Sequence, residues 1–442
     1  MTTSPATVPV SVKDPESKDP ESKGADYAVR YASVRRTTES LARRLSPEDQ
    51  MLQSMPEASP VKWHLAHTTW FFETFLLLPH LKGYRSFNPE FTYLFNSYYN
   101  MVGERPERPN RGLMSRPGID SILRYREHVD RAMLQLSECN PGPEVLAVIE
   151  IGLQHEQQHQ ELIITDIKHA FWMQPLRPAY SQRPPEDFTA PAGIEWVPFE
   201  GGIRHAGYSG DGFAFDNESP RHQVLLQPFH LASRLVTNAE YSGFMEDGGY
   251  RRPELWLSDG WEVARSSHWR APLYWIEDDG WKIFTSSGVG EVDWNEPVCH
   301  VSFYEADAYA RWAGVRLATE FEWEFAAESI LAAGQQEGKQ ASISGNFLED
   351  ERFHPAPAKQ ASGPLQQMFG DCWEWTASPY VAYPGYRPLE GALGEYNGKF
   401  MCNQMVLRGG SCITPRSHIR ASYRNFFPAQ TRWQFSGIRL AR

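Results

Sequence analysis

Two histidines stand four residues apart in the helix-forming stretch Gly152-Leu-Gln-His-Glu-Gln-Gln-His-Gln-Glu161. On a helix, residues i and i+4 lie one above the other on the same face, so His155 and His159 could hold one metal ion between their imidazoles. Such a pair needs a third ligand from elsewhere in the chain. The alternative interpretation is that both histidines are solvated residues on an exposed helix face.

The residues from His155 to His159 also satisfy the H-E-x-x-H pattern of zinc peptidases, whose glutamate is the general base. In the extended form of that pattern a glycine and a histidine follow three and six residues later, but this chain has Leu162 and Thr165 there. After Ala170 the sequence soon reaches prolines and offers no glutamate on a following helix. A zinc peptidase therefore stays as an alternative without an identified third ligand.

A third histidine lies upstream, in Trp63-His-Leu-Ala-His67. His67 belongs to an amphipathic pattern whose apolar side carries Trp63, Trp70 and Phe71, a setting that is also typical of a histidine satisfied within a core. In combination with the downstream pair, His67 is the best candidate for the third ligand.

Helical patterning predicts the elements that would position these histidines. The sequence indicates helices at about 27–45, 60–77, 119–136 and 143–172. Helices of this length with one long connection predict an up-and-down four-helix bundle, in which metal ligands project inward from facing helices. His67 would then come from the second helix, and His155 and His159 from the fourth.

The connection between the second and third predicted helices is long and rich in functional groups. It contains Phe91-Thr-Tyr-Leu-Phe-Asn-Ser-Tyr-Tyr-Asn100, followed by several arginines among prolines. A long loop inside a compact domain is more often functional than structureless. We expect Tyr98 or Tyr99 to bring a phenol to the metal, and Arg111 or Arg116 to bind a substrate carboxylate, since guanidinium groups suit bidentate recognition. A lid that packs its aromatic residues against the rest of the protein is the alternative.

Composition limits the class of protein. The 442 residues suffice for two or three domains, and the net charge of -12 argues against a nucleic-acid or anionic-membrane surface. No apolar run approaches the roughly 20 residues of a membrane helix, and the N-terminus has no apolar signal region, so we predict a soluble, cytoplasmic protein. The five cysteines form no C-x-x-C pair, which predicts that most are small buried residues rather than disulfides or zinc ligands.

Shifts in composition divide the chain. Residues 1–25, with a tandem Lys-Asp-Pro-Glu-Ser repeat, predict a disordered tail; residues 26–173 are helical; and 174–190 form a linker rich in proline, arginine and glutamine. Residues 191–442 are turn-rich and tryptophan-rich, with short strands and brief helical patterns at 238–245, 304–312 and 320–327. The predicted fold class is therefore α+β and multidomain: a four-helix bundle followed by an α+β domain with much irregular structure.

Several motifs resemble those of the ergothioneine-pathway sulfoxide synthases: Trp63-His-Leu-Ala-His67, His155-Glu-Gln-Gln-His159, Gly370-Asp-Cys-Trp-Glu-Trp-Thr376, Leu407-Arg-Gly-Gly-Ser411 and Gly437-Ile-Arg-Leu440. The resemblance covers nearly the whole chain beyond residue 25. It implies a DinB-like bundle followed by a formylglycine-generating-enzyme-like domain with a C-type-lectin-like fold. Formylglycine-generating enzymes bind copper with a cysteine pair, but Cys412 has no such partner here, so we do not expect sulfatase maturation.

The resemblance implies an oxygen-dependent non-heme Fe(II) enzyme. Such an enzyme joins the imidazole C2 of N-alpha-trimethylhistidine (hercynine) to the sulfur of a cysteine-type thiol and leaves hercynylcysteine sulfoxide. His67, His155 and His159 would hold the iron, with open positions for the substrates and for dioxygen as cosubstrate.

The same resemblance assigns the remaining site residues. Gln158 and Asn425 would contact the betaine and Phe426 would line its pocket, since quaternary ammonium groups favour aromatic surroundings. On the sequence alone, Asn425 and Phe426 equally fit a turn residue and a core aromatic.

A phenol near the reacting oxygen would donate a proton or hydrogen atom and prevent wasteful thiol oxidation. In some family members this tyrosine follows the Trp-Glu-Trp-Thr block, where Tyr380, Tyr383 and Tyr386 stand here. The Tyr98–Tyr99 pair is typical of another branch. We predict that the donor belongs to the Tyr98–Tyr99 pair, with Tyr383 as the alternative.

The residues after Asn425 bear on the thiol substrate. Family branches that use gamma-glutamylcysteine carry an acidic residue soon after this asparagine, whereas Phe426, Phe427 and Pro428 follow it here. We therefore predict free cysteine, with gamma-glutamylcysteine as the alternative. A non-catalytic binding module built on the lectin-like domain is a third class of function, for which the three histidines would be dispensable. The sequence leaves open a structural Ca²⁺ in the second domain and a homo-oligomeric state.

Overall fold

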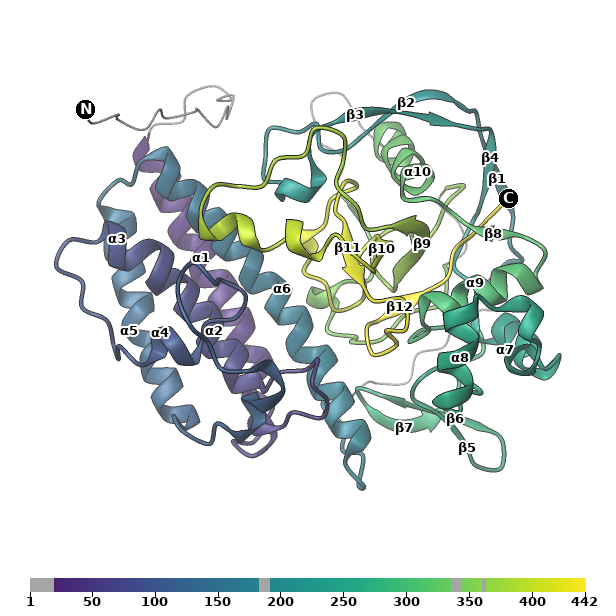
Figure 1. Ribbon diagram of the computed structural model, residues 1–442, viewed down its shortest axis with the longest axis horizontal. Helices are drawn as coiled ribbons and strands as arrows, with labels where there is room; N and C mark the ends of the chain where they lie inside the picture. The colour runs from purple at the N-terminus through teal and green to yellow at the C-terminus, as the bar shows by residue number, and fades with distance from the viewer. Residues whose placement is uncertain (1–19, 183–190, 335–342, 360–362) are drawn as a thin grey trace.

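The computed structural model describes residues 20–182, 191–334, 343–359 and 363–442 (Figure 1). Residues 1–19 of the predicted tail and 183–190 of the predicted linker lie outside the described residues. Figure 1 shows a helical half, in purple and blue, beside a second half of short strands and helices, in green and yellow. The predicted order of a helical bundle followed by an α+β domain is confirmed.

The first half is built on the predicted long helices: α1 (Pro20–Arg43), α2 (Val61–Phe72), α5 (Ile119–Glu138) and α6 (Pro143–Met173). α1 and α2 each pack against both α5 and α6. Two short helices, α3 (Leu78–His80) and α4 (Phe91–Leu94), lie in the connection between α2 and α5. α1 begins earlier than predicted and takes in residues 20–25, which were expected to belong to the tail; proline's fixed φ suits the first helical position.

α2 is buried along its whole length and changes its winding at its end. A π-helical turn at Glu73–Leu77 continues it, so the predicted second helix consists of an α-helical part followed by a π-helical turn. The buried Glu73 carboxylate accepts hydrogen bonds from the hydroxyls of Tyr84 and Tyr125, both at 2.6 Å. These bonds fix the end of α2 against α5.

α2 and α6 approach each other closely at Gly152, about one turn before His155. A Cβ atom at Gly152 would lie 2.5 Å from Cε1 of Phe72 and 3.0 Å from Cε1 of Phe71. Only glycine allows this contact, which brings the histidine-bearing faces of the two helices together.

The second half contains several small sheets. One has the strand order β1-β4-β13-β8, formed by β1 (Trp196–Phe199), β4 (Phe229–Ala232), β13 (Leu440–Ala441) and β8 (Arg316–Leu317). Another has the order β11-β10-β9-β12, formed by β11 (Asn425–Phe427), β10 (Met405–Arg408), β9 (Trp373–Pro379) and β12 (Ser436–Gly437). The remaining strands are β2 (Gly202–Ala206) with β3 (His222–Leu226), and β5 (Trp275–Glu277), β6 (Trp281–Thr285) and β7 (Gly288–Glu291). β12 runs parallel to β9, and β11 pairs antiparallel with β10.

Helices α7 (Asn238–Glu246), α8 (Ser258–Ser266), α9 (Phe303–Trp312) and α10 (Glu320–Ala333) pack around these sheets. Three of them begin at capping boxes, in which a Ser or Thr and the Glu three residues later bond to each other's backbone: Thr237 with Glu240, Ser302 with Glu305, and Thr319 with Glu322. The sequence predicted these three. It missed α8, whose N-cap is Leu257 and makes no side-chain cap.

One hydrophobic cluster spans the two halves, and the second half also has a core of its own. A single cluster joins Ile167 and Phe171 of α6 to Tyr274, Cys372 and Phe435 of the second half. α6 therefore belongs to the helical bundle and also packs against the second half, beside which it runs in Figure 1.

All five cysteines are free thiols; Cys299, Cys372 and Cys412 are buried, and Cys139 and Cys402 are exposed. Within the described ranges, no helix combines the length and the apolar character needed to cross a membrane.

Candidate metal centre

The three histidines singled out by the sequence lie together in the interior. Ligand atoms of His67 on α2 and of His155 and His159 on α6 are all within 4.8 Å of one another. The i, i+4 spacing places the α6 pair on one helix face. The indole of Trp63 stacks on His67 with ring centroids 4.5 Å apart, which holds that ring in place.

Hydrogen bonds fix which nitrogen of two of these rings faces the cluster. His67 Nδ1 lies 2.7 Å from the carbonyl oxygen of Phe95, so Nδ1 carries the proton and Nε2 keeps its lone pair. His64 Nε2 donates to Asp166 Oδ2 at 3.0 Å, which leaves His64 Nδ1 to accept from His159 Nδ1 at 2.7 Å. The lone pair of His159 is therefore on Nε2 as well. A carboxylate–histidine relay of this kind orients a ligating imidazole.

The protonation states suit metal binding. Burial lowers the pKa of His155 to about 4, and burial with neighbouring imidazoles holds the pKa values of His67 and His159 well below their usual range. His155 Nδ1 is buried and has no hydrogen-bond partner. Three neutral imidazoles whose ligand atoms lie this close together fit a divalent transition metal that keeps open positions. Among the described residues no second group of this kind occurs, so the structure adds no support for the calcium site that the sequence left open.

The glutamate of the H-E-x-x-H pattern is not available as a base. Glu156 is fully buried and forms ion pairs with Arg35 Nη1 at 2.9 Å and Arg126 Nη2 at 3.1 Å. Although burial opposes ionisation, these two guanidinium groups lower the pKa of Glu156 to about 2. The carboxylate holds α6 to α1 and α5, and the geometry gives the zinc-peptidase alternative no general base.

A cavity of about 340 Å³ borders the histidines and has walls from both halves of the protein. Its lining includes the other residues predicted to act in the site: Tyr98, Tyr99, Arg111, Gln158, Asn425 and Phe426. The second half adds aromatic rings, among them Phe215, Phe400, Tyr423 and Trp433. The site therefore lies where the two halves meet.

Two predicted residues lie elsewhere. Arg116 is exposed at the surface, and its Nη1 donates to the carbonyl oxygen of Ser115 at 3.1 Å. The hydroxyl of Tyr383 is held inside the second half by Glu320 at 3.3 Å and by Arg408 at 3.1 Å. Neither residue lines the cavity. Among the predicted arginines and phenols, the fold therefore brings Arg111 and the Tyr98–Tyr99 pair to the cavity beside the histidines.

The two other tyrosines after the Trp-Glu-Trp-Thr block also have partners of their own. Tyr380 stacks on Phe426 with centroids 4.0 Å apart and accepts from Asn217 Nδ2 at 2.9 Å. Tyr386 donates to Asp216 Oδ2 at 3.0 Å.

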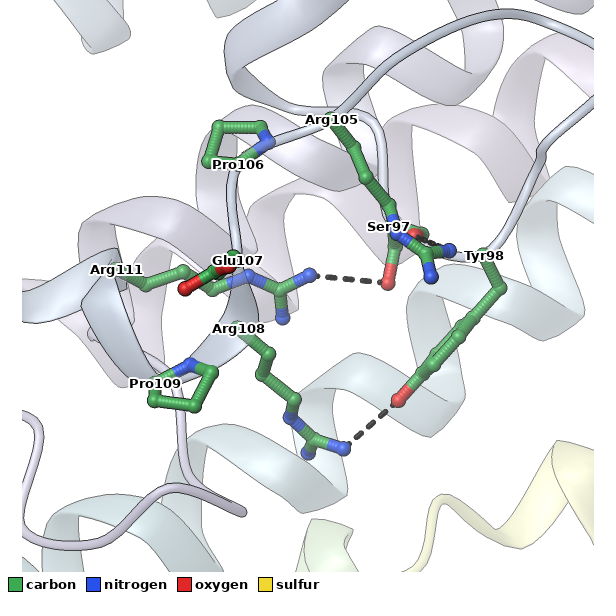
Figure 2. Close-up of a pocket in the computed structure, with 8 residues that line it drawn as sticks. All are labelled: Ser97, Tyr98, Arg105, Pro106, Glu107, Arg108, Pro109 and Arg111. Carbon is green, nitrogen blue, oxygen red and sulfur yellow. Dashed lines mark hydrogen bonds between the residues drawn. The ribbon is translucent and has the colours of Figure 1, made fainter.

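Tyr98 and Tyr99, which are adjacent in the sequence, have different surroundings. Tyr98 accepts a hydrogen bond from Arg108 Nη1 at 2.7 Å (Figure 2) and packs its ring against Phe400. Tyr99 is buried against Trp70, with centroids 5.5 Å apart, and Trp70 in turn stacks on His67. Burial raises the pKa of Tyr99, so its phenol keeps its proton at neutral pH.

Three arginines gather beside Ser97 and Tyr98, as Figure 2 shows: Arg105, Arg108 and Arg111. Arg111 is buried, donates to Ser59 Oγ at 2.9 Å and Ser97 Oγ at 3.1 Å, and stacks over Trp63. Burial and the charge of Arg108 lower the pKa of Arg111 to about 9. No carboxylate of the described residues forms an ion pair with any of the three. A buried guanidinium without a counter-ion beside a cavity is suited to binding an anion.

Sequence reasoning missed His64, Asp166 and Tyr396. His64 stands three residues before His67, within the Trp-His-Leu-Ala-His motif, and this i, i+3 spacing was a usable signal. Tyr396 lies in the connection between β9 and β10 and lines the cavity with Tyr98 and Tyr99. Nothing local in the sequence indicates that placement.

Comparison with known proteins extends these observations. Residues 184–442 match the family model of the sulfatase-modifying factor enzyme 1-like domain. The chain is 31% identical over 406 residues to a hercynine oxygenase of Mycolicibacterium thermoresistibile, covering 87% of this chain and 88% of that protein. It is 32% identical over 421 residues to a hercynine oxygenase of Mycolicibacterium smegmatis, covering 88% and 92%. A formylglycine-generating enzyme of Streptomyces coelicolor is 32% identical over 251 residues, covering 47% of this chain and 75% of that enzyme.

Proposed function

The chain belongs to the hercynine oxygenase family, and on this premise we propose that it forms a carbon–sulfur bond between imidazole C2 of hercynine and the sulfur of cysteine in ergothioneine biosynthesis. The reaction would consume dioxygen and give hercynylcysteine sulfoxide. One observation carries the proposal: three neutral imidazoles converge beside a cavity built by both halves.

We assign Fe(II) as the metal, with His67, His155 and His159 as its ligands. A bound ferrous ion would supply coordination of the thiolate and the reduction of dioxygen. His64 and Asp166 hold the ring of His159 in the orientation that this requires.

Hercynine carries a quaternary ammonium, which favours aromatic surroundings. Phe426 and the rings of Phe215 and Tyr423 line the cavity on the side of the second half, next to Gln158 and Asn425. These residues would bind the betaine and direct its imidazole toward the histidines.

Arg111 would bind the carboxylate of the thiol substrate, because it is buried at the cavity without an acidic partner among the described residues. Three carboxylates line the cavity: Asp166 bonds to His64 and Ser59, Glu161 bonds to residues of the second half, and Glu57 is exposed. A glutamyl ammonium would find no free buried carboxylate there, which supports cysteine over gamma-glutamylcysteine.

The phenols of Tyr98 and Tyr99 would donate the proton or hydrogen atom that steers oxidation toward the sulfoxide. Tyr98 accepts its hydrogen bond from Arg108, so its own O–H stays free to donate.

Product analysis tests the proposal. Iron-loaded protein is supplied with hercynine, dioxygen and either cysteine or gamma-glutamylcysteine, and the products are identified by mass spectrometry. We expect hercynylcysteine sulfoxide from cysteine. A strong preference for the glutamyl thiol would overturn the choice of thiol, and absence of any sulfoxide with both thiols would overturn the proposed reaction.

A further inference from the structure

A row of hydrogen-bonded side chains runs beside α6 from the buried Glu150, which is ion-paired with the more exposed Arg30, to the cavity. Its members are, in order, Glu150, Gln154, His418, Tyr423 and Gln158. The successive contacts measure 2.8, 2.6, 3.0 and 2.9 Å. The two ends lie eight residues apart on one helix, or about 12 Å along its axis. We call this row the α6 relay.

The Glu150 end determines the direction of every hydrogen bond in the relay. Glu150 is ion-paired with Arg30, at 2.7 Å, and an ionised carboxylate can only accept. Gln154 Nε2 must therefore donate to Glu150, which leaves Gln154 Oε1 to accept from Nδ1–H of His418. The proton of the neutral His418 is then on Nδ1.

The rest of the relay follows from that tautomer. His418 Nε2 has a lone pair, so the Tyr423 hydroxyl donates to it. The hydroxyl oxygen in turn accepts from Gln158 Nε2. The amide of Gln158 is thereby fixed with Nε2 toward Tyr423, and its Oε1 is bonded to no described residue.

The interior enforces this order. Gln154, His418 and Tyr423 are buried, at 4%, 1% and 4% exposure, where a misdirected polar contact is costly. Burial and the nearby charge of Arg420 hold the pKa of His418 well below its usual range, so the ring stays neutral. A reversed Gln154 would turn its carbonyl toward the Glu150 carboxylate.

We propose that the α6 relay presents the carbonyl oxygen of Gln158 to the substrate, which makes Glu150, Gln154, His418 and Tyr423 positioning residues that favour a cationic group over a carboxylate there. A carbonyl oxygen attracts the polarised methyl groups of a trimethylammonium or an N–H donor, whereas an exposed amide NH₂ would attract a carboxylate. The substrate half of this inference rests on the proposed function.

Two variants, one at the buried Glu150 and one at the more exposed Arg30, separate the relay from the ion pair that ends it. Glu150→Gln and Arg30→Met both remove the ion pair. Only Glu150→Gln also removes the carboxylate, which can accept hydrogen bonds but cannot donate them. We expect Glu150→Gln to lower the ratio of affinities for hercynine over 3-(imidazol-4-yl)propionate, which lacks the ammonium, by about three- to tenfold. Arg30→Met should keep the wild-type ratio. Calorimetric titration of the anaerobic iron-loaded protein measures both.

The histidine tautomer tests the relay without any substrate. The sample is full-length, zinc-loaded protein labelled with ¹⁵N-histidine, measured by NMR. The His418 resonances are assigned by their loss in His418→Gln. We expect them to show the Nδ1–H form in the wild type and in Arg30→Met. An Nε2–H tautomer in the wild type would overturn the relay. Equal affinity ratios for the wild type and Glu150→Gln would overturn the substrate half. A wild type that shows the Nδ1–H form but binds no hercynine would instead overturn the proposed function and, with it, the substrate half.

Discussion

The indole Nε1 of Trp373 donates a hydrogen bond of 2.6 Å to Glu161 Oε1, across 212 residues of sequence. The same carboxylate accepts from Thr414 Oγ1 at 2.6 Å and Gln434 Nε2 at 2.8 Å. Glu161 stands two residues after the candidate ligand His159 on α6. Three segments of the second half are thus bonded to the helix that carries two of the histidines.

Removing this carboxylate should loosen the contact between the halves. We predict that Glu161→Ala lowers the free energy of unfolding by about 3 kcal/mol or more, because it leaves three buried donors without an acceptor. Glu161→Gln keeps one amide oxygen for Trp373 and Gln434 and should lose much less. Denaturant titration measures both variants, and equal losses would show that the acceptor is not what stabilises the interface.

The hydrogen bonds between Asp166 and His64 and between His64 and His159 should determine the affinity for metal. We predict that Asp166→Ala, which frees His64 and hence His159, weakens metal binding by about tenfold to a hundredfold. Asp166→Asn retains an oxygen that can accept from His64 and Ser59, and its loss should stay below that of the alanine variant. Competition with a chelator gives the affinities. Unchanged affinity in Asp166→Ala would show that His159 is oriented by other contacts.

The helices and the candidate histidine ligands could be predicted from the sequence because both depend on local periodicity. Four-residue spacing on a helix fixes the relation of His155 to His159 whatever surrounds them. By contrast, Arg111 and Arg116 stand in the same proline-rich segment, and only the folded loop buries the first and exposes the second. The bond from Trp373 to Glu161 likewise depends on how the two halves dock, which no short pattern encodes.

The predicted phenols should control the product rather than the uptake of oxygen. We expect the double variant Tyr98→Phe/Tyr99→Phe to shift the product from the sulfoxide to oxidised thiol while dioxygen is still consumed, since a proton or hydrogen-atom donor is lost. The single variants assign the role to one ring. Tyr93→Phe, at a residue of α4 that is 44% exposed, is the matched control. A wild-type product ratio in the double variant would remove both tyrosines from the mechanism.

Asp371 should make stability depend on pH. Its carboxylate accepts from Asn346 Nδ2 and from the backbone N–H of Ala356, both at 2.8 Å, but burial raises its pKa from 3.8 to about 6. Between these pH values the folded chain holds a proton that the unfolded chain has lost. The stabilisation from that proton is therefore full below about pH 4 and is lost as pH rises through 6.

Asp371→Asn keeps the acceptor oxygen, and asparagine tolerates the left-handed backbone at this position, where φ is 56°. We predict that, from pH 4 to pH 7, the wild type loses about 2 kcal/mol of stability relative to Asp371→Asn. Asp211→Asn, at an exposed position, serves as the control. A difference between the wild type and Asp371→Asn that is constant across this range would contradict the prediction.

We propose above all that His67, His155 and His159 hold one iron at which hercynine, a thiol and dioxygen react. Dioxygen uptake by anaerobically iron-loaded protein, measured with iron content in the same samples, tests it most directly. We predict uptake only when hercynine and cysteine are both present, in the wild type and in His205→Ala, which alters an exposed residue of β2. In His67→Ala we predict neither bound iron nor uptake. Uptake at the wild-type rate in His67→Ala would contradict this proposal.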